Sequence, residues 1–458
     1  MSEINDSVAD TLRQASILIE QKIDNLLNIE QDQTSGPQKF VLLKSMDVIL
    51  DRLQVLKVTC DQMDEAIDVY MTMNSTGLNL LASDLIKSLL IKYSNADGVA
   101  LAKWNAVVEN VGDKSLDQFL RYYLLVYGDE DRLIRKNEVY KKFETLIERA
   151  NPGVEAAILA AQMLEDLVEK SEVYGLLLGR IPNDGAFEEF NVTRIGLSSL
   201  LDSYRSLFLI LLDSNFEMSS SDRNSLILQA EGFVVRWLVC KKPAQTLEKL
   251  FQDWARVLVK GSGSAEACEA VQKLIEEHTP TDDVVLQSLK SPLADADLAR
   301  FILFRVDERL GGNAAMVEFV PKRVHVEHIA PKSGGGNWPQ NLGVRTVRGT
   351  AGKARYHALI DLLGNKVILD YKINNQIKDS NFVIKKNGQE KKRGKKLRGY
   401  VDSVFPMARD LQNVETWEAT VIHERTAWIA DCLVSTWPVK GKQMKVEQFS
   451  KWISGSRK

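Results

Sequence analysis

Apolar residues recur every three or four positions along the first 310 residues, and this spacing limits the fold more than any other feature of the chain. Clear examples are SVADTLRQASILIEQKIDNLL, SLDQFLRYYLLVYG and RNSLILQAEGFVVRWLVC. Such spacing places the apolar side chains on one face of a helix. Short polar breaks at residues 95–98, 151–153 and 181–185 separate the stretches at ordinary helix lengths. We therefore expect a multi-helix domain over residues 1–310.

The sequence changes character near Gly311. Ten of the 27 glycines fall in residues 321–400. Two runs of β-compatible residues, 323–329 and 362–369, are joined by a Gly-rich segment, and a polar stretch suited to a short helix follows them. We expect a small α+β domain over residues 311–400.

The end of this domain and the chain after it are expected to differ. The composition of residues 385–399, KKNGQEKKRGKKLRG, predicts a mobile basic loop. Residues 401–458 are expected to form C-terminal helices that pack on the α+β domain, with Trp417, Ile422, Ile429 and Leu433 on one face. The fold class predicted for the whole chain is mainly α.

Basic residues concentrate in the same α+β segment. The 458 residues carry 59 Lys and Arg against 62 Asp and Glu, a net charge of -3. Residues 321–400 contain 18 of the basic and 5 of the acidic residues, so this window is +13 and the remainder is -16. A basic segment within an acidic chain predicts contact with nucleic acid, with a solubilising loop as the alternative.

The remaining composition excludes several classes of protein. With 45% hydrophobic and 26% charged residues, the chain is typical of a globular protein and not of a disordered or collagen-like one. Cys60, Cys240, Cys268 and Cys432 lie far apart, so we expect reduced thiols and no zinc site. The polar N-terminus and the shortness of the longest apolar run, residues 207–212, predict a cytoplasmic protein without membrane contact.

Two of the five histidines, His325 and His328, lie in the segment VHVEHIAP at the end of the first expected strand. A strand end holds a side chain firmly and still exposes it, which suits a general base. The alternative is a pair of half-exposed histidines without a chemical role. His357 and His423 are expected at the surface or in packing.

Motifs of one family follow one another in this region. They are Glu327-His328-Ile329-Ala330-Pro331, Gly364-Asn365 through Leu369, Asn374, and Asn381-Phe382-Val383-Ile384-Lys385. Their order resembles E-H-I-x-P, G-N-x-x-x-L, N and N-F-x-x-K of the C-terminal nuclease domain of GmrSD-type restriction endonucleases, within the HNH superfamily. The resemblance implies a ββα-metal finger and a metal-dependent DNA endonuclease that acts in bacterial defence, including against modified phage DNA.

The resemblance also implies roles for individual residues. His328 would be the general base and Asn365 would orient its ring, while Glu327 and Asn374 would bind one Mg²⁺ or Mn²⁺ ion through oxygen. Such an ion stabilises the charge that develops on the phosphate. The basic side chains expected to contact DNA phosphates are Lys385, Lys386, Lys391, Lys392, Arg393, Lys395 and Lys396.

Strand geometry leaves some of these assignments open. Neighbours on a regular strand face opposite ways, so Glu327 and His328 serve one phosphate only if the strand ends there, which Pro331 makes plausible. Asn375 is an alternative to Asn374 as the metal ligand, and His325 shares a strand face with Glu327.

A second resemblance lies in residues 70–87, YMTMNSTGLNLLASDLIK, which are similar to F-x-x-x-N-x-x-G-x-x-L-x-x-x-D-L-I-K of GmrS-type domains. The string predicts a turn at 74–77 and a helix that starts at Ala82-Ser83, with Asp84 in its first turn. Near the C-terminus, Trp417, Ile422 and Arg425 form a W-x-x-x-x-I-x-x-R pattern that also resembles this family.

No D-G-Q-Q-R string and no G-x-x-x-x-G-K-[ST] loop occur in the chain. We therefore expect no NTP site and no nucleotide cofactor here, and either a partner subunit with the ParB-like NTPase module or an NTP-independent activity. The alternative function is a non-catalytic DNA-binding or assembly subunit, and RNA is the alternative substrate. The sequence does not decide between a single chain and a homo-oligomer.

Overall fold

The computed structural model describes residues 81–94, 98–128, 132–149, 154–182, 187, 190–310, 319, 323–344, 350–390 and 396–440. The chain divides into two compact units after Ala66, and all of these residues belong to the second unit, Ile67–Lys458. The turn expected at 74–77 and the first expected helices lie outside the described residues.

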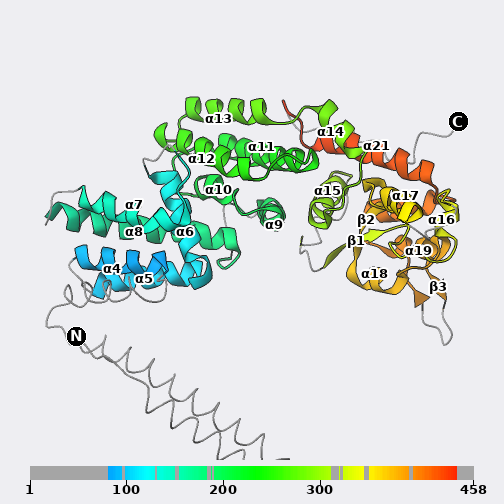
Figure 1. Ribbon diagram of the computed structural model, residues 1–458, viewed down its shortest axis with the longest axis horizontal. Helices are drawn as coiled ribbons and strands as arrows, with labels where there is room; N and C mark the ends of the chain where they lie inside the picture. The colour runs from blue at the N-terminus through cyan, green and yellow to red at the C-terminus, as the bar shows by residue number, and fades with distance from the viewer. Residues whose placement is uncertain are drawn as a thin grey trace, which may run out of the picture. The chain divides into compact units, whose positions relative to one another are not determined.

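Helices fill the described part of the chain up to residue 310, as the apolar spacing predicts (Figure 1). They are α4 (Ala82–Tyr93), α5 (Gly98–Val111), α6 (Asp113–Tyr127), the 3₁₀ turn η2 (Lys136–Glu138), α7 (Val139–Glu148), α8 (Val154–Leu178), α9 (Asn191–Leu200), α10 (Arg205–Leu211), α11 (Ser220–Val239), α12 (Gln245–Lys260), α13 (Ala265–His278), α14 (Asp282–Leu289) and α15 (Ala296–Arg309). The start of α4 at Ala82, with Asp84 in its first turn, confirms the prediction from the GmrS-like string.

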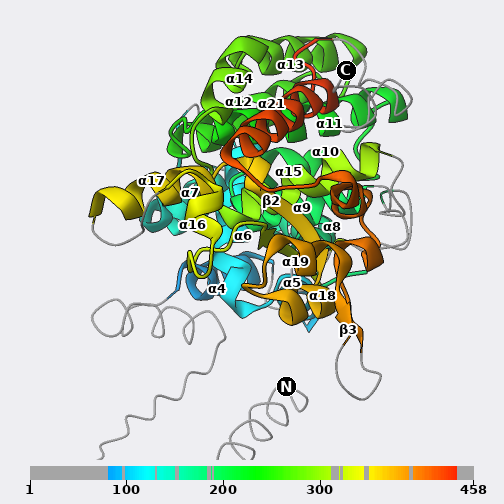
Figure 2. The same cartoon turned by 90° about the vertical axis from the view of Figure 1, so that its right-hand side faces the viewer.

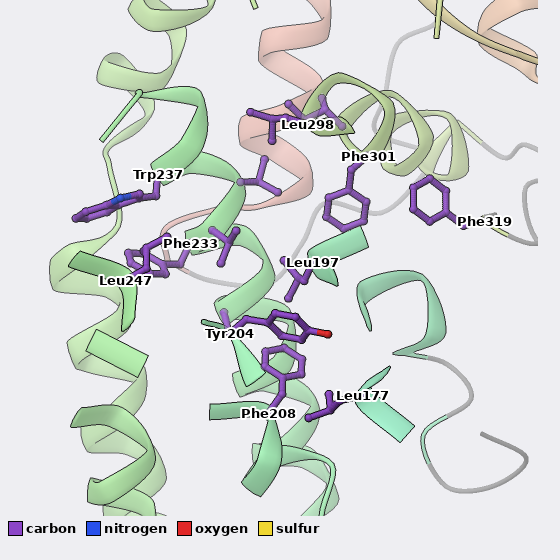
Figure 3. Packing of buried hydrophobic residues seen from close by; sticks show 14 of the residues in the cluster. Leu177, Leu197, Tyr204, Phe208, Phe233, Trp237, Leu247, Leu298, Phe301 and Phe319 are labelled. Atoms are coloured by element: carbon purple, nitrogen blue, oxygen red, sulfur yellow. The ribbon is translucent and has the colours of Figure 1, made fainter. Parts of the chain in front are cut away.

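Aromatic side chains fill the core between these helices. The ring centres of Tyr204 and Phe208, in the α10 region, lie 5.1 Å apart in an edge-on contact. The ring centres of Phe301 of α15 and Phe319 lie 5.9 Å apart (Figure 3). The same buried cluster continues into the strands and the last helix. The helical part and the α+β part therefore share one hydrophobic core.

A buried carboxylate links three helices of this core to Trp437. Glu231 of α11 accepts hydrogen bonds from Thr193 of α9, from Arg305 of α15 and, at 2.8 Å, from the indole nitrogen of Trp437. The Arg305 guanidinium also donates to Glu308 at 2.8 Å. Because Glu231, Thr193 and Trp437 are buried, each depends on the others for its hydrogen bonds. We call these residues the Glu231 network.

Two antiparallel strands follow, as expected. Strand β1 (Val324–His328) pairs with β2 (Lys366–Asp370) in a register that places His325 opposite Leu369 and His328 opposite Lys366. Between them lie α16 (Trp338–Asn341), α17 (Thr350–Ile360) and the 3₁₀ turn η5 (Leu363–Asn365), and α18 (Tyr371–Ile377) follows β2 directly. The second expected run was placed four residues too early, because 362–365 form a turn in which the Asn365 amide donates to Leu362.

The rest of the chain closes around these strands. Helix α19 (Phe382–Asn387) leads into the short strands β3 (Gln389–Glu390) and β4 (Lys396–Leu397), and η6 (Tyr400–Asp402), α20 (Pro406–Arg409), η7 (Asp410–Asn413) and α21 (Ala419–Thr436) follow. The expected loop at 385–399 is therefore corrected at its start, where residues 385–387 are helical. Trp417, Ile422, Ile429 and Leu433 are all buried, which confirms the apolar face predicted for this segment.

The strands lie against helices from both sides of the sequence. Helix α15 contacts β1 and β2, and α21 contacts α14, α15 and η5 (Figures 1 and 2). These contacts cross the boundaries expected at 310/311 and 400/401, which stay predictions. Among the described helices, none has both the length and the apolar composition needed to cross a bilayer.

Candidate active site

The turn that follows β1 is held by the side chain of Asn365. Its amide donates to the carbonyls of Ala330 and Ile360 at 3.0 Å each, and its carbonyl accepts from Ala330 N and from the Trp417 indole at 2.9 Å each. In addition, the backbone N–H of Ile329 donates to the backbone carbonyl of Asn365 at 2.9 Å. Asn365 thus fixes the backbone just after His328. It was expected to bond to the ring itself, and the structure instead places it on the backbone.

Helix α21 holds the segment that carries Asn365. Arg425 donates to the carbonyls of Gly364 and Lys366 at 2.6 Å each, and Gly364 N donates to Thr426 Oγ1 at 3.0 Å. A Cβ atom at Gly364 would lie 2.1 Å from the Ile422 carbonyl, so only glycine lets the segment approach the helix this closely. The motif residues Gly364, Trp417 and Arg425 therefore hold Asn365 in place together. We call these three residues the latch.

The His328 ring lies on the side of β1 that faces Asp361. Its Nε2 atom is 3.4 Å from Asp361 Oδ1, a charge contact without hydrogen-bond geometry, and the side chain is 15% exposed. The buried Lys366 ammonium is 3.9 Å from the same carboxylate and donates to the Leu293 carbonyl. Burial and the nearby Lys366 and Lys332 lower the pKa of His328 to about 4, although Asp361 opposes the shift. The imidazole is therefore neutral at pH 7 and holds a lone pair.

Glu327 faces the opposite way, as alternation along a strand requires. Its carboxylate accepts a hydrogen bond from the Lys385 ammonium, which also donates to the His328 carbonyl at 3.0 Å. Lys385 is fully buried, and its ammonium lies 5.8 Å from the centre of the Trp338 ring. The structure thus differs from two predictions: Glu327 has an internal cation, and Lys385 is turned away from any DNA phosphate.

His325 and Asn374 meet on the same side of β1 as Glu327. The Asn374 amide nitrogen is 3.4 Å from His325 Nδ1, and the His325 ring makes an edge-on contact of 5.0 Å with Tyr371. Asn374 is half-buried and Asn375 is exposed. The structure therefore brings Asn374, and not Asn375, to the strand, while its role as a metal ligand stays a prediction.

The remaining predicted phosphate contacts are only partly described. Lys386 donates to the Val414 carbonyl at 2.9 Å, so its ammonium also points to the protein. Lys391, Lys392, Arg393 and Lys395 lie outside the described residues, and only the backbone of Lys396, in β4, is described. Their contact with DNA stays a prediction.

The predicted donor set does not fit a divalent cation as it is arranged here. One Glu327 oxygen is bound to the Lys385 ammonium, and a second positive charge at that carboxylate would be repelled by the first. Within the described ranges, no three His, Cys, Asp or Glu side chains come together. No chemical step is therefore assigned to a metal at Glu327.

Sequence reasoning did not single out Asp361 or Tyr400. Asp361 faces His328, and the fully buried Tyr400 lies beside Glu327, where burial and the carboxylate raise the pKa of Tyr400 well above its usual value. Asp361 is one of only five acidic residues within the basic window, which is a usable signal. No comparable signal marks Tyr400. His357 and His423 are exposed, as expected.

A comparison with known protein families supports the resemblance of the strand region to GmrSD restriction endonucleases. No curated protein matches the chain. Residues 281–432 match the family described as GmrSD restriction endonucleases, C-terminal domain. The match begins at the start of α14 and ends within α21, so it includes both strands and the latch on Asn365. This segment of the chain is therefore similar to the C-terminal domain of GmrSD restriction endonucleases.

Proposed function

We propose that the chain is a DNA endonuclease of the HNH type, in which His328 is the general base. The observation that carries this proposal is the position of the His328 ring, which is held at the end of β1 with Nε2 3.4 Å from the Asp361 carboxylate. The match of the surrounding segment to a restriction endonuclease domain supplies the substrate class. Restriction of foreign DNA is the biological role that follows.

The contacts around His328 suit this role. When Nε2 carries its proton toward Asp361, Nδ1 keeps the lone pair that accepts a proton from water. The hydroxide formed in this way attacks phosphorus, the bond from phosphorus to one bridging oxygen breaks, and that oxygen leaves and takes up a proton from solvent. Lys385 holds the His328 carbonyl and Asn365 holds Ala330, so the backbone that directly follows the ring is fixed. Fixing a base in position is a main source of its catalytic effect.

Plasmid cleavage tests the proposal. The full chain is incubated with supercoiled DNA and Mg²⁺ or Mn²⁺, and His328→Ala is compared with His357→Ala, an exposed histidine of α17. We expect His328→Ala to lose roughly 100-fold or more in rate, because general-base groups contribute about that much, and His357→Ala to cut normally. Equal cleavage by His328→Ala and wild type would refute the assignment.

The same assay separates the alternative function. A non-catalytic DNA-binding subunit would bind DNA in a salt-dependent way and show no metal-stimulated cleavage by the wild type. Replacing Lys391, Lys392, Arg393, Lys395 and Lys396 by Gln tests the basic segment under either function. The slope of affinity against salt should flatten, and an unchanged slope would remove this segment from the DNA contact.

A further inference from the structure

The Glu327 carboxylate has a cation that belongs to the chain. Lys385 reaches it from α19, 58 residues later in the sequence, and its ammonium also bonds the His328 carbonyl. The Lys385 side chain is 0% exposed and that of Glu327 is 10% exposed, so water screens the pair poorly. The contact is thus a buried ion pair and not a surface one.

The way α19 is built places Lys385 there. Asn381 caps the helix by accepting a hydrogen bond from Ile384 N at 3.0 Å. From this start, Phe382 and Lys385 are three residues apart and share the buried face, where Phe382 packs on Trp417 at 5.3 Å. The position of Lys385 is therefore fixed by a capped helix and an aromatic contact.

The groups around the Lys385 ammonium carry oxygen atoms that can accept hydrogen bonds or bind a metal ion. They are the Glu327 carboxylate and the His328 carbonyl, and the buried Tyr400 hydroxyl lies beside the same carboxylate without a well-formed hydrogen bond among the described residues. Carboxylate, carbonyl and hydroxyl oxygens are the ligands that Mg²⁺ and Mn²⁺ prefer. The surroundings that hold the ammonium would therefore also suit a hard metal ion, but not both cations at once.

We propose that Lys385 is the resident cation of Glu327, so that a divalent metal ion binds this carboxylate only when the Lys385 ammonium is removed. This inference concerns cation binding alone and goes beyond the proposed nuclease function. Its consequence is competition: the internal ammonium and an external metal ion exclude each other from one oxygen site.

Binding of Mn²⁺ alone, without DNA, tests the proposal. Free Mn²⁺ is followed by electron paramagnetic resonance during titration of the full chain. The comparison is with Glu327→Gln combined with Lys385→Met, which replaces the buried pair by neutral side chains of similar shape and is expected to fold. The wild type and this double variant should bind Mn²⁺ equally weakly. A loss of more than tenfold in affinity in the double variant would overturn the proposal, because Glu327 would then bind metal with Lys385 present.

Removal of the ammonium alone supplies the opposite prediction. Lys385→Ala leaves the carboxylate and space beside it, so Mn²⁺ should bind at least tenfold more tightly than to the wild type and should raise the melting temperature. Glu327→Gln added to Lys385→Ala should abolish both effects. Lys386→Ala, which removes the neighbouring cation that bonds Val414, is the matched control and should behave as wild type. Equal Mn²⁺ affinity of Lys385→Ala and wild type would also overturn the proposal.

The design remains decisive if Lys385→Ala folds poorly. Recovery of its fold by Mn²⁺, and not by K⁺ at equal ionic strength, would support the proposal. A fold that neither ion restores leaves the comparison of wild type with the double variant, which decides by itself. Because no DNA is present, failure here does not bear on His328 as a base.

Discussion

Two buried glutamates, one in the helical part and one at the end of β1, are neutralised in different ways. Glu231 receives an arginine, a hydroxyl and an indole N–H, and both of its oxygens are used. Glu327 receives one lysine on one oxygen. A guanidinium is fixed in a planar network of hydrogen bonds, whereas an ammonium is a compact point charge. The first carboxylate is a structural centre, and the second is suited to exchange its cation.

Removal of the Glu231 carboxylate should destabilise the fold more than any other change considered below. Glu231→Ala leaves the buried Trp437 indole without its acceptor and takes from Arg305 its buried carboxylate partner, so we expect the free energy of unfolding to fall by about 3–5 kcal/mol. Chemical denaturation measures this loss. Glu308→Ala is the control, because Glu308 bonds the same arginine at the protein surface and its removal should cost less than about 1 kcal/mol. Equal losses would show that Arg305 does not depend on Glu231.

A neutral hydrogen-bond network should cost less to break than a charged one. Asn365→Ala removes four hydrogen bonds and leaves the Ala330 amide and the Trp417 indole unpaired, for a loss of about 3 kcal/mol. Trp417→Phe removes a single donor and should cost clearly less. Both are measured by denaturation. A loss larger than that of Glu231→Ala would mean that charge is not what separates the two regions.

A third buried carboxylate, Asp307 of α15, has no cation bound to it by a hydrogen bond among the described residues. Asp307 Oδ1 accepts from Met407 N at 2.7 Å, and Oδ2 has no hydrogen bond within the described residues. Burial raises the pKa of Asp307 from 3.8 to about 7. The native state therefore keeps a proton that the unfolded chain has lost, so the free energy of unfolding falls as the pH rises from 3.8 to about 7 and is level above that.

Asp307→Asn should remove this pH dependence. The amide oxygen still accepts from Met407 N, so we expect the variant to be more stable than wild type at pH 8 and close to it near pH 4. Melting temperatures at the two pH values measure the difference. Glu231→Gln serves as the contrast, because it should lower stability at both. A destabilised Asp307→Asn at pH 8 would show that the native carboxylate is charged and well solvated.

The secondary structure was predictable where local pattern decides it. Apolar spacing identified the helices, and the two β-compatible runs identified the strand pair. The motif residues Asn365, Trp417 and Arg425 were found as strings, but their common latch was not, because it joins residues 52 to 61 positions apart.

The least predictable feature was the direction of Lys385. It opens a strongly basic run, so composition suggested the surface, yet capping by Asn381 turns it inward together with Phe382. The partner of Glu327 follows from that helix and not from the residues around the glutamate. Likewise, the contact of His328 with Asp361 depends on how the segment between the strands returns to β1.

Helix α21 has a mechanical consequence. At 1.5 Å per residue, its 18 residues make a strut of roughly 27 Å. Directly after the helix, the Trp437 indole donates to Glu231 and the Trp437 carbonyl accepts from Arg236. Toward the start of the helix, Arg425 and the preceding Trp417 bond the segment that contains Gly364 and Asn365. A displacement of the helical bundle would therefore be transmitted to β1 along a single stiff helix. A chain that ended before α21 would lose the contacts of Trp437 with Glu231 and those of Arg425 with residues 364 and 366 at the same time.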